Sequence, residues 1–94
     1  MLWILLAEDR SDRGHLRIEN RDAHLAWLAD SADHVVRAGP FLTDDGSAMT
    51  GSMLVLDFPD RASVEEWAAG DPYLAAGLFQ SVTIKQWKEV IKPG

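Results

Sequence analysis

His24 is the side chain of this 94-residue chain best suited to proton transfer. It lies on a predicted helix, roughly 40° around the axis from Leu28, and therefore at the edge of the apolar face. An imidazole changes its charge near neutral pH, which suits a general base. The alternative is a structural histidine that packs against Trp27 or Leu28, and the helical pattern alone favours that alternative.

Asp71 is the second candidate, and it comes directly before Pro72. Aspartate followed by proline is typical of a helix start, where the carboxylate caps the first turn and contributes about 1 kcal/mol. Composition and spacing give no reason to pair Asp71 with His24. Capping alone therefore explains Asp71 at this level.

Arg21 falls within the apolar stripe of the same predicted helix, one turn before Leu25. A charged side chain there must reach the surface or serve an interior anion. The pairs Gly39-Pro40 and Gly51-Ser52 flank predicted strands, where glycine permits the close approach of a backbone or a ligand. Turn and bulge formation explains both pairs equally well. Ser52 has no neighbouring base in the sequence, so a nucleophilic role is unsupported.

The elements that must position these residues follow a β-α-β-β-α-β order typical of the split βαβ, ferredoxin-like α+β arrangement. Apolar and β-branched runs predict strands at 3–7, 35–38, 53–58 and 79–90. Helices are predicted at 20–34 and 63–70, the second opened by a Ser63–Glu66 capping box, with a short turn of helix at 71–77. Segments 8–14 and 43–47 are predicted loops. The predicted buried stripe of the first helix comprises Leu25, Leu28, Ala29, Ala32 and Val35.

Composition excludes several classes of protein. Fifteen acidic residues against nine basic ones give a formal charge of −6, which disfavours nucleic-acid and membrane-surface partners. Without cysteine there is no disulfide framework, thiolate metal site or cysteine nucleophile, which fits a cytoplasmic protein. The apolar start lacks the basic residues of a signal peptide and the length of a membrane span. His15, His24 and His34 match no metal-ligand spacing, and no nucleotide-binding motif is present, so no cofactor is expected.

Several segments together match one family: MLWILLAEDR at the start, RDAHLAWL from Arg21, the tripeptides AGP and TGS in the middle, then AGDPYLAAGLF and VTIKQWKEV. On these segments the chain resembles the YCII-related (YciI-like) family over essentially its full length. The Arg-x-x-His-Leu and Asp-Pro-Tyr pieces are the more specific ones. Asp22 departs from the pattern, since relatives often carry proline there, but it affects no site residue.

The resemblance implies a single ferredoxin-like domain over residues 1–94 that assembles into a homodimeric α/β barrel. It also implies an active site around a histidine–aspartate pair, which maps onto His24 and Asp71. The residues implied around that cleft are Arg21, Gly39, Pro40, Ser52, Pro72 and Tyr73.

The function expected from this resemblance is a small cytoplasmic enzyme that performs general acid–base chemistry on a small anionic organic molecule. The reaction would be of the lyase, dehydrochlorinase or isomerase type. His24 would move a proton and Asp71 would orient it, while Arg21 and Ser52 would position the substrate. The alternative is a non-catalytic ligand-binding or dimeric accessory module in which His24 and Asp71 form a structural pair. A metal site at the same two residues is a third hypothesis.

Overall fold

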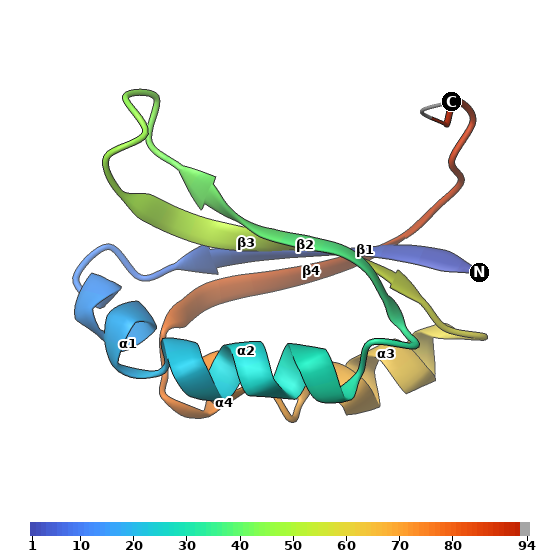
Figure 1. Ribbon diagram of the computed structural model, residues 1–94, viewed down its shortest axis with the longest axis horizontal. Helices are drawn as coiled ribbons and strands as arrows, with labels where there is room; N and C mark the ends of the chain where they lie inside the picture. Colours follow the sequence, from blue (N-terminus) through green and yellow to red (C-terminus); the bar gives the residue numbers. More distant parts are fainter. Residues whose placement is uncertain (93–94) are drawn as a thin grey trace.

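A four-stranded sheet forms one layer of the molecule and the helices form the other (Figure 1). The computed structural model of the chain describes residues 1–92. Its elements are β1 (Leu2–Asp9), α1 (Gly14–Glu19), α2 (Arg21–Asp30), β2 (Val35–Leu42), β3 (Met49–Asp57), α3 (Arg61–Ala68), α4 (Pro72–Ala75) and β4 (Phe79–Trp87). None of the helices in this part of the chain is long and apolar enough to cross a membrane.

The strands lie in the order β2-β3-β1-β4, and every neighbouring pair is antiparallel. β1 is central, so that Leu5 is paired with Leu54 on one side and with Ile84 on the other. Helices connect β1 to β2 and β3 to β4, whereas a hairpin joins β2 to β3. This is the ferredoxin-like α+β arrangement that the sequence predicts.

The core lies between the sheet and the helices. Alternate residues of β1 point into it, and Trp3, Leu5 and Ala7 are almost fully buried there. The residues between them face the opposite side of the sheet, which no helix covers (Figure 1). Alternation with period two therefore gives β1 two apolar faces, of which the chain covers one.

Several element boundaries differ from the sequence-based predictions. A short helix, α1, begins at Gly14, where the predicted loop ends, and α2 ends at Asp30 rather than at 34. β2 continues through Gly39-Pro40 to Leu42, because an edge strand tolerates a proline. Asp60, not Ser63, caps α3, since its carboxylate accepts a hydrogen bond from the Ser63 N–H.

The predicted buried stripe of the first predicted helix is wrong in part: Leu28 and Val35 pack against the core, whereas Leu25, Ala29 and Ala32 are exposed. Leu25 is 48% exposed, whereas His24, the residue before it, is only 6% exposed and is the one fully buried residue of α2. Trp27 and Leu28 are half-buried beside it. The helix is thus rotated so that a polar residue faces the core, which requires a hydrogen-bonding partner inside the protein.

Two glycines are required by the backbone around the site. At Gly51 of β3, a Cβ atom would collide with the carbonyl oxygen of Ala7 on β1. Gly77 has a φ of 79° and ends the turn after α4. Gly51 lets β1 and β3 approach closely beside Ser52, and Gly77 returns the chain to β4.

Candidate active site

His24 and Asp71 meet inside the protein. His24 Nδ1 lies 2.9 Å from Asp71 Oδ1, and both side chains are more than nine-tenths buried. Asp71 is the N-cap of α4 and Pro72 is its first residue, as the sequence predicts. The same Oδ1 accepts a hydrogen bond from the Tyr73 N–H at 2.9 Å. One carboxylate oxygen therefore both caps α4 and binds the imidazole of His24 on α2.

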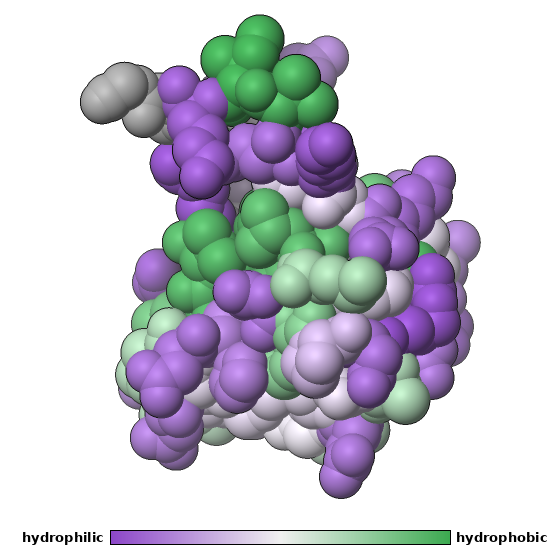
Figure 2. Space-filling model, turned by 90° about the vertical axis from the view of Figure 1, so that its right-hand side faces the viewer, coloured by the Kyte–Doolittle hydropathy of each residue, from purple (hydrophilic) through white to green (hydrophobic). Residues whose placement is uncertain are grey.

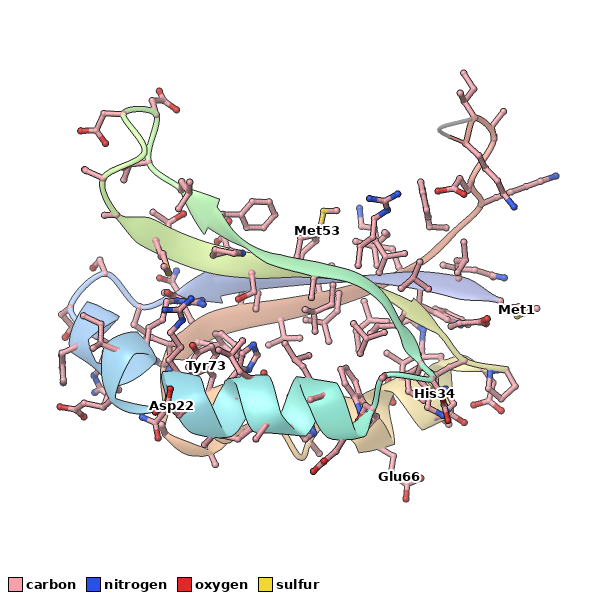
Figure 3. The ribbon with its side chains drawn as sticks, viewed as in Figure 1. Met1, Asp22, His34, Met53, Glu66 and Tyr73 are labelled. Atoms are coloured by element: carbon pink, nitrogen blue, oxygen red, sulfur yellow. The ribbon has the colours of Figure 1, made fainter. Side chains whose placement is uncertain are left out.

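Tyr73 supports the imidazole from one side. Its ring stacks on that of His24 with centroids 4.0 Å apart and planes 15° apart. Figure 3 shows Tyr73 between the sheet and α2, where it is 2% exposed. Burial raises the pKa of the Tyr73 hydroxyl, and the charges of Arg17 and Arg21 offset part of this rise.

Arg17 of α1 is a site residue that the sequence analysis misses. Its guanidinium donates two hydrogen bonds to the Asp9 carboxylate, at 2.8 and 2.7 Å, and a third to Ser52 Oγ at 3.0 Å. It also lies over the Tyr73 ring, 4.8 Å from the centroid. Burial lowers the pKa of Arg17, but the hydrogen bonds and charge of Asp9 outweigh it, and the net pKa is raised. Its position one helical turn before Arg21 is the only signal in the sequence that could have found it.

A cavity of about 140 Å³ lies in front of His24. β3 contributes Ser52 and Leu54 to it, and Tyr73 lines it from α4. Met49 of β3 lines it as well, and the remaining walls come from α1, α2 and β2, namely Arg17, Arg21, Leu25, Leu28, Ala38, Gly39 and Pro40. The cavity thus combines an apolar lining with two guanidinium groups.

The remaining ring nitrogen of His24 is directed to this cavity. Within residues 1–92, the only hydrogen bond of the ring is the one through Nδ1, and no buried side-chain nitrogen or oxygen is left without a partner. Since Nε2 has no protein partner, it must be accessible from the cavity that His24 lines. With Nδ1–H donating its hydrogen bond to Asp71, Nε2 of the neutral ring presents a lone pair there.

The residues expected from the family resemblance come together in part. Six of them border the same cavity: Arg21, His24, Gly39, Pro40, Ser52 and Tyr73. Asp71 contacts His24 but does not line this cavity. Pro72, the first residue of α4, does not border the cavity. Arg21 is exposed at the rim and does not lie in a buried stripe. Over the described residues, no three His, Asp or Glu side chains are grouped as metal ligands would be.

Comparison with known proteins places the chain in a family. The model of the YCII-related domain matches residues 1–88. The chain belongs to the YCII-related family. Protein YciI of Escherichia coli is 36% identical to this YCII-related protein over 97 residues, which cover 96% of this chain and 99% of the relative. A Haemophilus influenzae relative is 30% identical over the same share of each chain.

One solved structure of similar sequence is that of 5-chloro-2-hydroxyhydroquinone dehydrochlorinase (TftG) from Burkholderia phenoliruptrix, in complex with 2,5-dihydroxybenzoquinone. It matches this YCII-related protein with a TM-score of 0.86 and 33% identity, over 94% of both chains. A more distant structure, from Agrobacterium tumefaciens, matches 99% of this chain with a TM-score of 0.57 and 14% identity. That likeness shows the fold alone.

Proposed function

We propose that this protein is a cytoplasmic, cofactor-independent enzyme that uses His24 as a general acid–base and Asp71 to orient it. The observation that carries the proposal is the arrangement of the imidazole. One ring nitrogen is held by a buried carboxylate, and the other is accessible from a cavity that also contains arginine. This is the geometry by which a carboxylate fixes the tautomer of a catalytic histidine.

In the proposed reaction, His24 Nε2 takes a proton from an acidic O–H or C–H bond of the substrate. The electron pair released on the substrate expels a leaving group such as chloride, which departs with its own bonding pair, so no oxidant or reductant is needed. Asp71 stabilises the imidazolium formed in this step. Arg21, at the rim, binds the anionic oxygen of the substrate. Ser52 accepts a hydrogen bond from Arg17, so its own hydroxyl proton remains available to the substrate.

The size of the cavity supports a small substrate. A cavity of about 150 Å³ holds one benzene molecule, so about 140 Å³ fits a single ring with few substituents. TftG, 33% identical to this chain, is by name a dehydrochlorinase of a chlorinated hydroxyhydroquinone. Together these observations support a dehydrochlorinase, or a related lyase or isomerase, acting on an anionic aromatic compound.

The test is chloride release from 5-chloro-2-hydroxyhydroquinone and related chlorohydroquinones, measured with a chloride electrode. His24→Gln should lower kcat/KM by about 10²- to 10⁴-fold, the usual contribution of a general base. Asp71→Asn should also lower kcat, since the amide can still cap α4 but brings no charge. His15→Gln, at an exposed histidine away from the cavity, is the matched control and should be unchanged.

The alternative is a binding module that catalyses no reaction. One observation favours it: His24 is deeply buried against Tyr73. It predicts that His24→Gln weakens ligand binding or folding. Ring ¹⁵N shifts of His24 decide whether the imidazole is held as proposed, since Asp71→Asn should change the balance of its two tautomers. Unchanged ring shifts together with reduced stability would show that Asp71 is only a helix cap.

We also propose that the protein is a homodimer, joined through the open face of the sheet into an α/β barrel. Met53 points away from the helices on that face (Figure 3), and Ile4, Val55 and Trp87 lie around it. The β2–β3 hairpin and the segment after β4 rise on the same side (Figure 1). Figure 2 shows hydrophobic atoms on that C-terminal segment, where Ile91 is 87% exposed. A second copy would cover this apolar surface.

Met53→Glu should therefore convert a dimer to a folded monomer, because it places a charge in the middle of the proposed interface. Sedimentation equilibrium measures the mass and circular dichroism the fold. Glu66→Lys, on the exposed side of α3, is the control and should leave the mass unchanged. A monomeric wild-type chain at micromolar concentration would contradict the proposal.

A further inference from the structure

A second cavity lies on the other side of Asp71. It has a volume of about 200 Å³ and is bounded by β1, β4, α3 and the region around α4. Its apolar lining comprises Leu5, Ala68, Ala69, Leu74, Phe79, Val82 and Ile84, and its two charged residues are Glu65 and Asp71. Asp71 borders this cavity and not the one in front of His24. The carboxylate thus separates two cavities of different character.

The second carboxylate oxygen of Asp71 is free on this side. Oδ1 accepts both protein hydrogen bonds, from His24 and from the Tyr73 N–H, and Oδ2 accepts none from residues 1–92. No buried side-chain oxygen of this region lacks a partner, so Oδ2 must be accessible, although the side chain is only 6% exposed. Because Asp71 lines only the second cavity, we infer that Oδ2 faces it.

The charges around the two cavities are opposite in sign. Arg17 and Arg21 border the cavity in front of His24, whereas the second cavity has two carboxylates and no basic residue in its lining. The Glu65 side chain makes no hydrogen bond or ion pair to the rest of the described chain. An apolar cavity with a nearly buried carboxylate and a second carboxylate beside it attracts a cation that carries a hydrocarbon group.

We propose that this second cavity binds a small alkyl- or arylammonium ion. The hydrocarbon part packs between Leu5, Leu74 and Ile84, and the ammonium group donates a charge-assisted hydrogen bond to Asp71 Oδ2. Glu65 adds attraction from α3. The cavity lies on the helix side of the sheet, so dimerisation through the open face would leave it accessible.

Binding of an ammonium ion in the second cavity affects His24 in the first cavity, because the Asp71 carboxylate contacts both. An ammonium ion at Oδ2 draws negative charge away from Oδ1, which weakens the hydrogen bonds that Asp71 accepts from the His24 ring and the Tyr73 N–H. Any effect on turnover rests on the proposed function. Binding itself does not, and the amide signal of Tyr73 reports it without any reaction.

The test is a titration of the full-length protein with n-butylammonium chloride at constant ionic strength, followed by amide and methyl NMR. We expect saturable shifts in the methyl groups of Leu5, Leu74 and Ile84 and in the Tyr73 amide. The neutral analogue n-butanol should bind several-fold more weakly, and butyrate should not bind. Equal affinity for butanol, shifts centred on Ser52 and Leu28 instead, or no saturation would each overturn the proposal.

Two matched variants on α3 test the charge. Glu65→Gln should weaken n-butylammonium binding about two- to fivefold, as expected for one partly exposed ion pair. Glu66→Gln, the next residue on the same helix and outside the cavity, should have no effect. Asp71→Asn should reduce the preference for the ammonium over the alcohol to the part that Glu65 supplies. If that variant does not fold, Ala69→Leu, which fills the mouth from an exposed position, should block binding instead.

Discussion

The two faces of the central strand carry equally apolar side chains but meet different surroundings. On the helix side, Trp3 and Leu5 are buried in the core, and no inaccessible side-chain nitrogen or oxygen within residues 1–92 lacks a hydrogen-bond partner. On the open side, Ile4 remains half-exposed and Met53 of β3 is 38% exposed. Apolar composition alone therefore does not show which face is covered by the chain itself. The helix side contains the candidate site, whereas the open side leaves apolar side chains exposed.

The largest effect should come from breaking the buried ion pair of the helix side. Arg17→Met would leave the Asp9 carboxylate, whose side chain is 5% exposed, without its partner. We expect a loss of about 3–5 kcal/mol in the free energy of unfolding, measured by urea denaturation. Arg10→Met, at an exposed arginine, should cost less than about 0.5 kcal/mol. A similar small loss for Arg17→Met would mean that Asp9 is solvated.

Two consecutive residues of β3 compare the faces directly. Leu54 is 2% exposed in the core, so Leu54→Ala should cost about 2–5 kcal/mol of stability. Met53→Ala should cost less than about 1 kcal/mol when measured at protein concentrations where the chain is monomeric. At higher concentration the Met53 effect should grow if the open face is an interface. Equal costs for the two variants in the monomer would remove the distinction between the faces.

Alkaline pH should lower the stability of the fold through Tyr73, which is buried on the helix side of the sheet. Burial raises the pKa of Tyr73 above its ordinary value of 10.0, so the folded state favours the neutral hydroxyl. This contribution to stability is complete below pH 10 and is lost as the pH rises through the raised value. Urea midpoints between pH 8 and pH 11.5 should therefore fall more steeply for the wild type than for Tyr73→Phe. Parallel curves would contradict this role of the hydroxyl.

The smallest effect belongs to the hairpin beyond the open face. Asp45 accepts hydrogen bonds from the side chains of Thr43 and Ser47 and from the Ser47 N–H, which lower its pKa from 3.8 to about 2. Its contribution is therefore present above pH 3.8 and is lost as the pH falls through about 2. Asp45→Asn should lower Tm slightly at pH 7 and not at pH 1.5. Asp44→Asn, whose carboxylate accepts no hydrogen bond within residues 1–92, is the control.

The sequence predicts the β-α-β-β-α-β order of elements and the Asp71 cap because these depend on local patterns. Periodicity identifies β1, and the Asp-Pro pair identifies the start of α4. Arg17 is missed because tertiary packing determines its ion pair with Asp9 and its contact with Ser52. In addition, α1 has no capping side chain from which the helix could be predicted. The rotation of α2 is missed for a related reason.

Hydrophobicity alone predicts that Leu25 faces the core. Stacking on Tyr73 and the hydrogen bond to Asp71 make the interior favourable for His24 instead, and neither partner is close in sequence. The family resemblance supplies this pairing of His24 with Asp71, which spacing alone does not indicate. Residues whose environment is made by distant elements are therefore the ones that a single sequence does not reveal.

The path of β2 through Gly39-Pro40 has a consequence for solubility. β2 is an edge strand, and an edge with a continuous row of free N–H groups can add strands from other molecules and nucleate aggregates. Pro40 has no N–H to offer, and the pairing of β2 with β3 is irregular between Val35 and Arg37. Strand addition along this edge is thereby discouraged, so a residue of the cavity wall also protects the chain from edge-to-edge aggregation.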